Sequence, residues 1–142
     1  MSEKVLLIDD EKEFLETLSE RMRMRGMDVN TAQSSEDAVS AVDSGDYDAI
    51  VLDLKMPGMN GIDMLKVIKA KHPDMQVILL TGEATLDAGI QAMKLGAMDF
   101  MEKPADIDVL TQKIKKAQAK KMLVVEKRTE EKVRDIMTSR GW

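Results

Sequence analysis

The chain has no cysteine among its 142 residues, which excludes disulfide bonds, thiolate metal sites and cysteine nucleophiles. It also has no long apolar run, so neither a secretory signal nor a membrane-spanning segment is expected, and a cytoplasmic location is the default expectation. Aromatic residues make up only 3%, yet 44% of the residues are hydrophobic and 33% are charged, as in ordinary globular proteins. A chain of this length has room for one domain with a substantial core.

The charges of the two signs are distributed unevenly. Residues 113–142 contain ten Lys or Arg and four Asp or Glu, a balance of +6, and the remaining residues 1–112 have eleven basic and twenty-two acidic groups, a balance of −11. A basic tail on an acidic body fits nucleic acid, an acidic partner or a solvated helix, and the solvated helix is the commonest of these. Roughly twenty residues beyond the fold are too few for a helix-turn-helix domain, so we expect no direct DNA binding by this chain.

Five short apolar segments alternate with segments of helical periodicity. The predicted strands are residues 4–9, 27–32, 49–53, 75–80 and 97–101. Apolar residues at spacings of three and four fill the intervals between them, and a last helix begins near Asp106. Strict alternation of this kind predicts buried parallel strands joined by right-handed crossover helices, which form a three-layer α/β sandwich.

Polar and charged side chains stand at the ends of four of these strands. Asp9 and Asp10 close the first and Asp53 the third, while Thr81 follows the fourth and Lys103 the fifth. The crevice of an open parallel sheet lies at the carboxyl ends of its strands, so we expect these side chains to meet there. Three carboxylates this close repel one another unless a cation joins them, and Mg²⁺ is the usual hard ion for oxygen ligands. A cation, a lysine and a hydroxyl around one carboxylate predict a phosphoryl site.

Asp9 and Asp10 can reach Asp53 only if the first strand lies inside the sheet. The predicted fold class is therefore the flavodoxin-like doubly wound sandwich, a five-stranded parallel sheet of order 2-1-3-4-5 with five helices, the last one extended. Simpler interpretations exist, because Asp53 can cap a turn and Asp9 or Asp10 can cap the first helix. Lys103 can likewise lie in an ordinary X-Pro loop, although a cis bond to Pro104 would aim it into the crevice. The joint placement at equivalent strand ends favours a site in which Asp10 is the direct ligand and Asp9 assists.

The segments around these residues resemble the receiver domain of two-component response regulators. The resemblance covers roughly residues 3–120, and its motifs are LIDDE (7–11), VLDLKMPGMNG (51–61), LTG (80–82) and GAMDFMEKP (96–104). It implies that Asp53 accepts a phosphoryl group from the phosphohistidine of a sensor histidine kinase or a phosphotransfer protein. Thr81 and Lys103 are then expected to contact the phosphoryl oxygens. In such a module the only catalysis is its own phosphoryl transfer and autodephosphorylation.

The resemblance also implies a metal site and two residues beside it. Mg²⁺, with Mn²⁺ as the alternative ion, is expected to be held by Asp10, Asp53 and the backbone carbonyl of Lys55, with Asp9 close by and acting indirectly. Lys55 and Glu83 stand at positions that tune hydrolysis of the phosphoryl group in this family. Because they carry opposite charges, we expect them to pair across the entrance and to obstruct attacking water.

A switch residue and an output face follow from the same resemblance. Phe100 occupies the aromatic switch position, and the expected coupling moves Thr81 toward the phosphoryl group and lets Phe100 rotate into the space that opens. The surface of the fourth helix, fifth strand and fifth helix is the expected face for a downstream protein partner or a homodimer. His72 is the only histidine and precedes Pro73, so a phosphohistidine relay within this chain is not expected.

The predicted domain boundaries are 1–120 for the receiver domain and 121–142 for a C-terminal helical extension. Apolar or small residues recur in the extension at spacings of three and four, at Met122, Val125, Thr129, Val133 and Ile136. This pattern is compatible with a lengthened last helix, a segment packed back on the domain or pairing with another copy. The sequence leaves these alternatives open.

The leading functional hypothesis is a phosphorylation-switched binding module. An alternative is the isolated receiver half of a transcriptional regulator whose output domain is missing, because the Asp53 and Phe100 regions look most like receivers of bacterial enhancer-dependent regulators. A phosphatase with an aspartyl nucleophile is less favoured, since such enzymes usually need a second Asp where this chain has Lys55. An FMN-binding flavodoxin is disfavoured because the acidic residues 9–11 would repel the cofactor phosphate.

Overall fold

The computed structural model describes residues 2–54, 60–82 and 86–139, and it has five strands and five helices in strict alternation. The strands are β1 (Lys4–Ile8), β2 (Asp28–Ala32), β3 (Ala49–Leu52), β4 (Val77–Thr81) and β5 (Asp99–Glu102). The helices are α1 (Lys12–Met24), α2 (Ser35–Ser44), α3 (Gly61–Lys71), α4 (Leu86–Lys94) and α5 (Ile107–Ser139).

The strands form one parallel sheet in the order β2-β1-β3-β4-β5, which confirms the predicted fold class. The three inner strands β1, β3 and β4 are the continuous apolar runs of the sequence, and nearly all of their residues are buried. The edge strands β2 and β5 are partly exposed. A strand that is covered on both faces has no polar side, which explains why these runs lack alternation.

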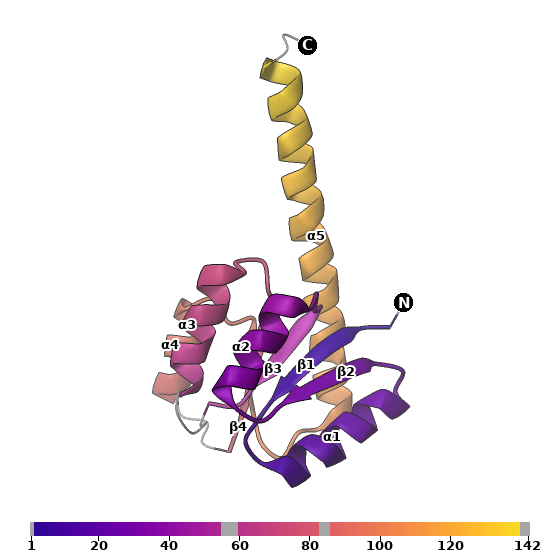
Figure 1. Ribbon diagram of the computed structural model, residues 1–142, viewed down its shortest axis with the longest axis vertical. Coiled ribbons are helices and arrows are strands. Elements are labelled where there is room, and N and C mark those ends of the chain that lie inside the picture. The colour runs from indigo at the N-terminus through magenta and orange to yellow at the C-terminus, as the bar shows by residue number, and fades with distance from the viewer. Residues whose placement is uncertain (1, 55–59, 83–85, 140–142) are drawn as a thin grey trace.

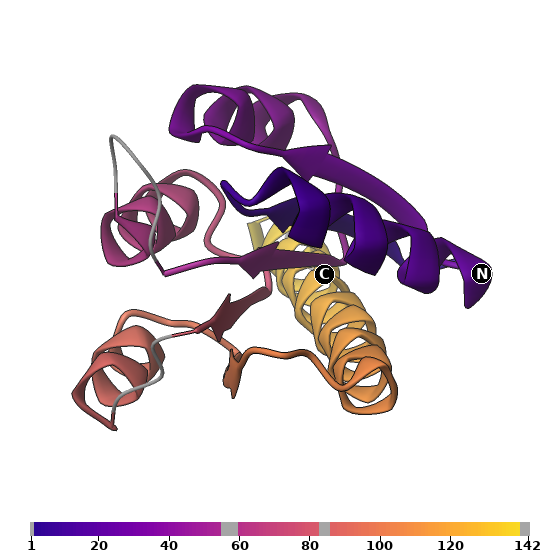
Figure 2. The ribbon, with the colours of Figure 1, turned by 90° about the horizontal axis from the view of Figure 1, so that it is seen from below.

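Helices cover both faces of the sheet (Figures 1 and 2). On one face, α2, α3 and α4 pack on the strands around Leu6, Ile50, Leu52 and Leu79. On the other face, α1 and α5 pack on the strands through the residues Leu15, Leu18, Met22, Leu110, Ile114 and Ala117. These two apolar layers hold the sheet rigid, so the residues at its carboxyl edge have fixed positions relative to one another.

The strand boundaries differ from the predicted ones by one or two residues. The fourth strand is Val77–Thr81 instead of 75–80, and the fifth is Asp99–Glu102 instead of 97–101. The reason is backbone pairing, which begins at Ile50 opposite Val77 and continues to Thr81 opposite Glu102. Thr81 is therefore the last residue of β4 rather than the residue after it. The sequence pattern between the fourth and fifth strands predicts a helix over residues 84–95, of which residues 84 and 85 lie outside the described residues.

The last helix, α5, is one continuous element of 33 residues, as the predicted extended helix requires. Its buried residues end at Ala117, and the remainder projects beyond the rest of the molecule, on the side away from the carboxyl ends of the strands (Figure 1). The extension is therefore a continuation of α5, and at its base Lys121 binds Asp46 and Arg128 binds Asp74 in two loops of the domain. Among the residues that the structure describes, no helix combines the length and the apolar character needed to cross a membrane.

Candidate functional site

Backbone hydrogen bonds continue past the strand ends and align the residues of the predicted site. The N–H of Asp53 donates to the carbonyl of Ile8 (2.9 Å), which places Asp53 beside Asp9 at the end of the neighbouring strand. Further along the same edge of the sheet, the N–H of Lys103, which follows β5, donates to the carbonyl of Thr81 at the end of β4 (2.8 Å). The carboxyl edge of the sheet thus brings together four residues that lie far apart in the sequence.

The start of α3 packs closely against the backbone that follows β3. A Cβ atom on Gly61 would lie 2.5 Å from the carbonyl oxygen of Asp53 and 2.5 Å from the Cα of Leu54, so only glycine fits. The Gly61 N–H donates to the Leu54 carbonyl (2.5 Å), and the Asn60 side chain caps α3 by accepting from the N–H of Asp63 (2.9 Å). These contacts fix the chain immediately after Asp53.

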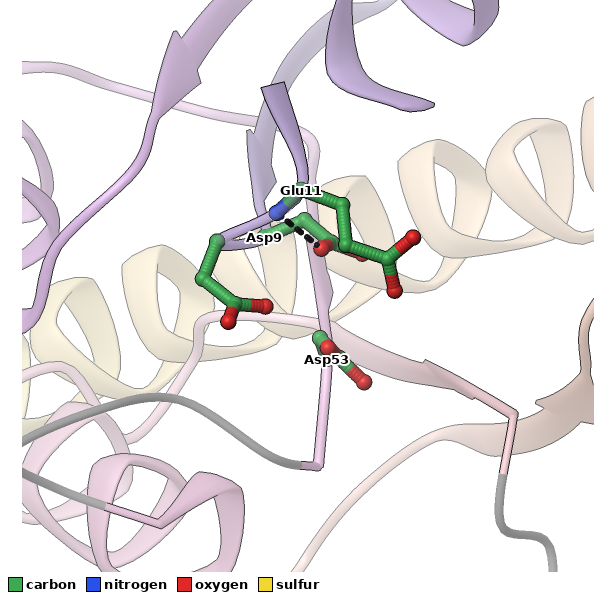
Figure 3. Close-up of side chains that lie close together, drawn as sticks. Asp9, Glu11 and Asp53 are labelled. Carbon is green, nitrogen blue, oxygen red and sulfur yellow. Dashed lines mark hydrogen bonds between the residues drawn. The ribbon is translucent and has the colours of Figure 1, made fainter. Parts of the chain in front are cut away.

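Four carboxylates gather at this edge. Asp9, Asp10, Glu11 and Asp53 each have a side-chain oxygen within 4.8 Å of the others. Figure 3 shows the side chains of Glu11 and Asp53 approaching the same space from the ends of different strands. Asp9 and Asp53 are buried, with exposed fractions of 1% and 5%, whereas Asp10 and Glu11 are exposed. Two buried anions beside two exposed ones form a strongly negative pocket that is open to solvent on one side.

Among the residues that the structure describes, Lys103 supplies the positive charge beside these carboxylates. Its Nζ lies 2.6 Å from Asp9 Oδ2, 3.7 Å from Asp53 Oδ2 and 3.3 Å from Glu11 Oε1. It also lies over the ring of Phe14, 4.1 Å from the centroid, on the side of α1. The Lys103–Pro104 peptide bond is cis, and the lysine points into the crevice.

Burial and the contact between Asp9 and Lys103 shift the pKa of each of these two residues in opposite directions. Burial, the largest effect, raises the pKa of Asp9, while the Lys103 hydrogen bond and the N–H of Glu11 lower it by less. Burial pushes the pKa of Lys103 down, but its hydrogen bond to Asp9 and the charges of Asp9 and Asp53 outweigh this and leave it raised. The lysine is therefore held firmly in its charged form, and the pocket remains net negative.

Asp9 has a different local role from the helix cap considered in the sequence analysis. The N-cap residue of α1 is Glu11, whose side chain makes no capping hydrogen bond. Asp9 Oδ1 accepts from the N–H of Glu11 (2.9 Å), two residues on, which closes the turn between β1 and α1 (Figure 3). The N-cap interpretation of Asp9 or Asp10 is therefore wrong, because the turn takes up two residues before the helix begins.

The structure also includes residues that sequence reasoning did not assign to the site. Glu11 belongs to the carboxylate cluster and contacts Lys103, although it was predicted only to add negative charge beside Asp9 and Asp10 and not as a site residue. Its position directly after Asp9 and Asp10 could have indicated that its carboxylate belongs to the same cluster. Phe14 lies in the apolar periodicity of α1, and nothing in a 3.6-residue period distinguishes a ring that faces a lysine. Lys55 and Glu83, the predicted tuning residues, lie outside the described residues.

Comparisons with known proteins agree with this geometry. Residues 5–115 match the family model described as the response regulator receiver domain. The chain is 35% identical over 126 residues to the C4-dicarboxylate transport transcriptional regulatory protein DctD of Rhizobium meliloti, covering 88% of this chain and 27% of DctD. It is 34% identical over 107 residues to the photosynthetic apparatus regulatory protein RegA of Cereibacter sphaeroides, covering 75% of this chain and 58% of RegA.

A solved structure extends the similarity to the coordinates. The receiver domain protein of Clostridium thermocellum superposes with a TM-score of 0.82 at 36% identity, covering 87% of this chain and 99% of that one. The chain therefore spans nearly the whole of an isolated receiver structure. In contrast, it spans less than two thirds of the curated relatives, which are longer regulators.

Proposed function

The chain belongs to the response regulator receiver domain family, and from this premise we propose that Asp53 is the residue that accepts a phosphoryl group from a histidine kinase or a phosphotransfer protein. The observation that carries the proposal is the position of Asp53. It is a buried carboxylate at the end of the central strand, beside Asp9 and 3.7 Å from the Lys103 ammonium. A carboxylate in this place is a nucleophile held next to a charge that can attract a phosphate.

We propose that Mg²⁺, or Mn²⁺ in its place, binds the same pocket through Asp10, Asp53 and the backbone carbonyl of Lys55, with Asp9 acting indirectly. The support is the donor set, because four carboxylates against one lysine leave an excess of negative charge on hard oxygen ligands. Asp9 is already engaged by Lys103 at 2.6 Å, while Asp10 is exposed, which favours Asp10 as the direct ligand. When bound, the ion neutralises charge on the phosphoryl oxygens.

In the proposed reaction a carboxylate oxygen of Asp53 attacks the phosphorus atom of the donor phosphohistidine. The new O–P bond forms as the N–P bond breaks, and the imidazole leaves with its electron pair. Lys103 stabilises the negative charge that builds up on the transferring group, and the hydroxyl of Thr81, the last residue of β4, is proposed to contact this group as well. Water later cleaves the acyl phosphate and resets Asp53. Lys55 and Glu83 are the residues proposed to slow this hydrolysis by pairing across the entrance.

The proposed output face consists of α4, β5 and α5, where a downstream partner or a second copy binds after phosphorylation. Helix α4 exposes the apolar side chains Leu86, Ile90 and Met93 on one side. On the inner side it passes Phe100 at Gly89, where an added Cβ would lie 3.6 Å from the ring. Phe100 is partly buried beside α4, and we propose that its ring rotates when Thr81 shifts toward the phosphoryl group. Activation requires only a shift in the balance between two states.

A matched pair of variants tests the phosphorylation site. The protein is incubated with Mg²⁺ and a small-molecule phosphodonor, and the intact mass is measured for wild type, Asp53→Asn and Asp63→Asn. Asp63 is an exposed carboxylate in the first turn of α3, ten positions further along the chain, and serves as the control. We expect one phosphoryl group on wild type and on Asp63→Asn, and none on Asp53→Asn. Phosphorylation of Asp53→Asn to the wild-type extent would refute the assignment.

We propose residues 1–120 as the receiver domain and 121–142 as an extension to it. The alternative is that the chain is the receiver part of a longer transcriptional regulator, and the specific observation in its favour is that the chain covers only 27% of DctD. In both cases a cytoplasmic location is proposed, because the curated relatives are regulators of transcription. Binding of the chain to a separately expressed output protein would support the first case.

A further inference from the structure

Phe14 brings an aromatic ring to the carboxyl edge of the sheet. It is the third residue of α1 and precedes Leu18 and Met22 by about one and two helical turns, so it continues the buried stripe of this helix. Leu18 and Met22 are buried, whereas Phe14 is only partly buried and packs against the same apolar layer. The first turn of α1 therefore carries a large apolar side chain to the place where the charged pocket begins.

The face of this ring contacts the ammonium group of Lys103. The Lys103 Nζ lies over the ring, 4.1 Å from its centroid. The same nitrogen donates hydrogen bonds to Asp9 Oδ2 at 2.6 Å and to Glu11 Oε1 at 3.3 Å. The Lys103 side chain is only 12% exposed, although a lysine ammonium is a strongly hydrated charge. Carboxylates and the Phe14 ring therefore replace most of the water around it.

An aromatic ring compensates the ammonium for this lost water, whereas an aliphatic side chain would not. The face of a phenyl ring has partial negative charge and attracts a cation within about 6 Å of its centroid. This attraction becomes stronger where water is excluded. An aliphatic side chain of similar size would remove water from the ammonium and offer no attraction in return. Lys103 would then turn its charged end toward solvent more often.

The contact matters for phosphoryl transfer because Lys103 must change partners. Its Nζ lies 2.6 Å from Asp9 Oδ2 but 3.7 Å from Oδ2 of Asp53, the proposed phosphoryl acceptor. To neutralise charge on a phosphoryl group at Asp53, the ammonium has to move from the first carboxylate toward the second. A hydrogen bond weakens steeply when donor and acceptor lose their alignment, but attraction to the face of a ring needs no such alignment. The ammonium can therefore move across the ring and keep this contact.

We propose that Phe14 is a positioning residue, whose ring keeps the Lys103 ammonium inside the pocket while the lysine moves from Asp9 toward the phosphoryl group. The inference rests on the proposed phosphorylation of Asp53, and it adds a residue of α1 to the groups that support this reaction. Phe14 acts through Lys103 and takes no part in making or breaking bonds.

Nuclear magnetic resonance tests the contact without any phosphoryl transfer. Protons held over the face of an aromatic ring are shifted upfield, so the ε-methylene protons of Lys103 should resonate upfield of those of the other lysines. Loss of this signal in Lys103→Arg assigns it. The shift should disappear in Phe14→Leu, which keeps an apolar side chain of similar size, and persist in Phe14→Tyr, which keeps the ring. Ordinary lysine shifts for Lys103 in wild type would overturn the proposal.

The rate of phosphorylation tests the consequence of the contact. The protein is incubated with acetyl phosphate and saturating Mg²⁺, and the phosphorylated fraction is followed by intact mass over time. Phe14→Leu should slow the reaction about three- to tenfold, as expected for the loss of a cation–π contact, and Phe14→Tyr should stay within about twofold of wild type. Leu18→Met, a swap of similar volume in the buried stripe of α1, is the control for a loosened helix and should leave the rate unchanged.

The outcomes separate this inference from the proposed function. Slow phosphorylation of Phe14→Leu that is restored in Phe14→Tyr supports the positioning role. Equal rates for Phe14→Leu and wild type, or equal losses in two Phe14 variants that both fold by circular dichroism, would overturn this role alone. A wild type that gains no phosphoryl group at all would overturn the proposed function and, with it, the role of Phe14 in phosphoryl transfer.

Discussion

Replacement of Gly61 by alanine tests how closely the start of α3 is held against the backbone of Asp53 and Leu54. The added Cβ would lie 2.5 Å from both the Asp53 carbonyl oxygen and the Leu54 Cα, and 2.8 Å from the Leu54 carbonyl oxygen. All three are backbone atoms, so no side-chain rotation relieves the overlap. Either α3 moves away from the sheet or the backbone of Asp53 shifts with it.

The magnitude follows from the cost of overpacking. Insertion of a methyl group into a closely packed region typically costs about 1–3 kcal/mol. The gain in helix propensity is small here because Gly61 is the first residue of α3. For a chain of this size, a loss of roughly 2 kcal/mol corresponds to a decrease in Tm of about 5–8 °C. We expect a decrease of this size, together with weaker Mg²⁺ binding because Asp53 is displaced.

The assay is thermal unfolding by circular dichroism with and without Mg²⁺, and Gly89→Ala is the control. Gly89 lies inside α4, where an added Cβ would be at an ordinary 3.6 Å from Phe100. Alanine is favoured over glycine in a helix by about 0.5–1 kcal/mol, so this variant should be slightly more stable than wild type. A Tm of Gly61→Ala equal to that of wild type would show that the start of α3 moves away from Asp53 and Leu54 at little cost and would refute the reasoning.

Three further predictions concern charged residues. Lys103→Ala removes the counter-ion of buried Asp9 and Asp53 and should cost about 3–5 kcal/mol in EDTA, with partial recovery on addition of Mg²⁺; no recovery would contradict the shared pocket. Burial raises the pKa of Asp9, so the charged carboxylate destabilises the folded state once the pH rises through the ordinary aspartate range. Asp9→Asn should therefore raise the Tm in EDTA at neutral pH, and this increase should disappear in acid, as Tm measurements at the two pH values would show. A hydrogen bond with His72 lowers the pKa of Asp43, so the charged Asp43 carboxylate slightly stabilises the folded state at neutral pH. Asp43→Asn should therefore lower the Tm slightly at neutral pH, and the difference from wild type should vanish as the pH falls through the lowered pKa, as a pH series of Tm measurements would show.

The sheet and its order were predictable because burial leaves a direct mark on the sequence. The segments at Leu6, Ile50 and Leu79 are apolar without alternation, since helices cover both faces of the inner strands. The placement of Asp53 beside Asp9 then required β1 inside the sheet. Strand ends were less predictable, because the partner strand decides where backbone pairing stops, and Thr81 was assigned one residue outside β4 for this reason.

The candidate site was predictable as a set of residues but not as a network. Carboxylates and a lysine at strand ends indicate a charged pocket, yet the sequence does not determine which carboxylate the lysine approaches. The structure gives Asp9 the closest contact, and it adds Glu11 and the ring of Phe14. These contacts depend on the turn after β1, whose geometry arises from a side-chain hydrogen bond that no periodicity encodes.

The length of α5 determines how far a small rotation of this helix displaces its C-terminal end. The helix begins directly after the β5 loop that carries Lys103, and its 33 residues span roughly 50 Å at about 1.5 Å per residue. Lys121 and Arg128 attach the helix to Asp46 and Asp74 in two loops of the domain, and the helix runs about 17 Å further from Arg128 to Ser139. A rotation of about 5° around this attachment would therefore move the end of the helix by about 1.5 Å.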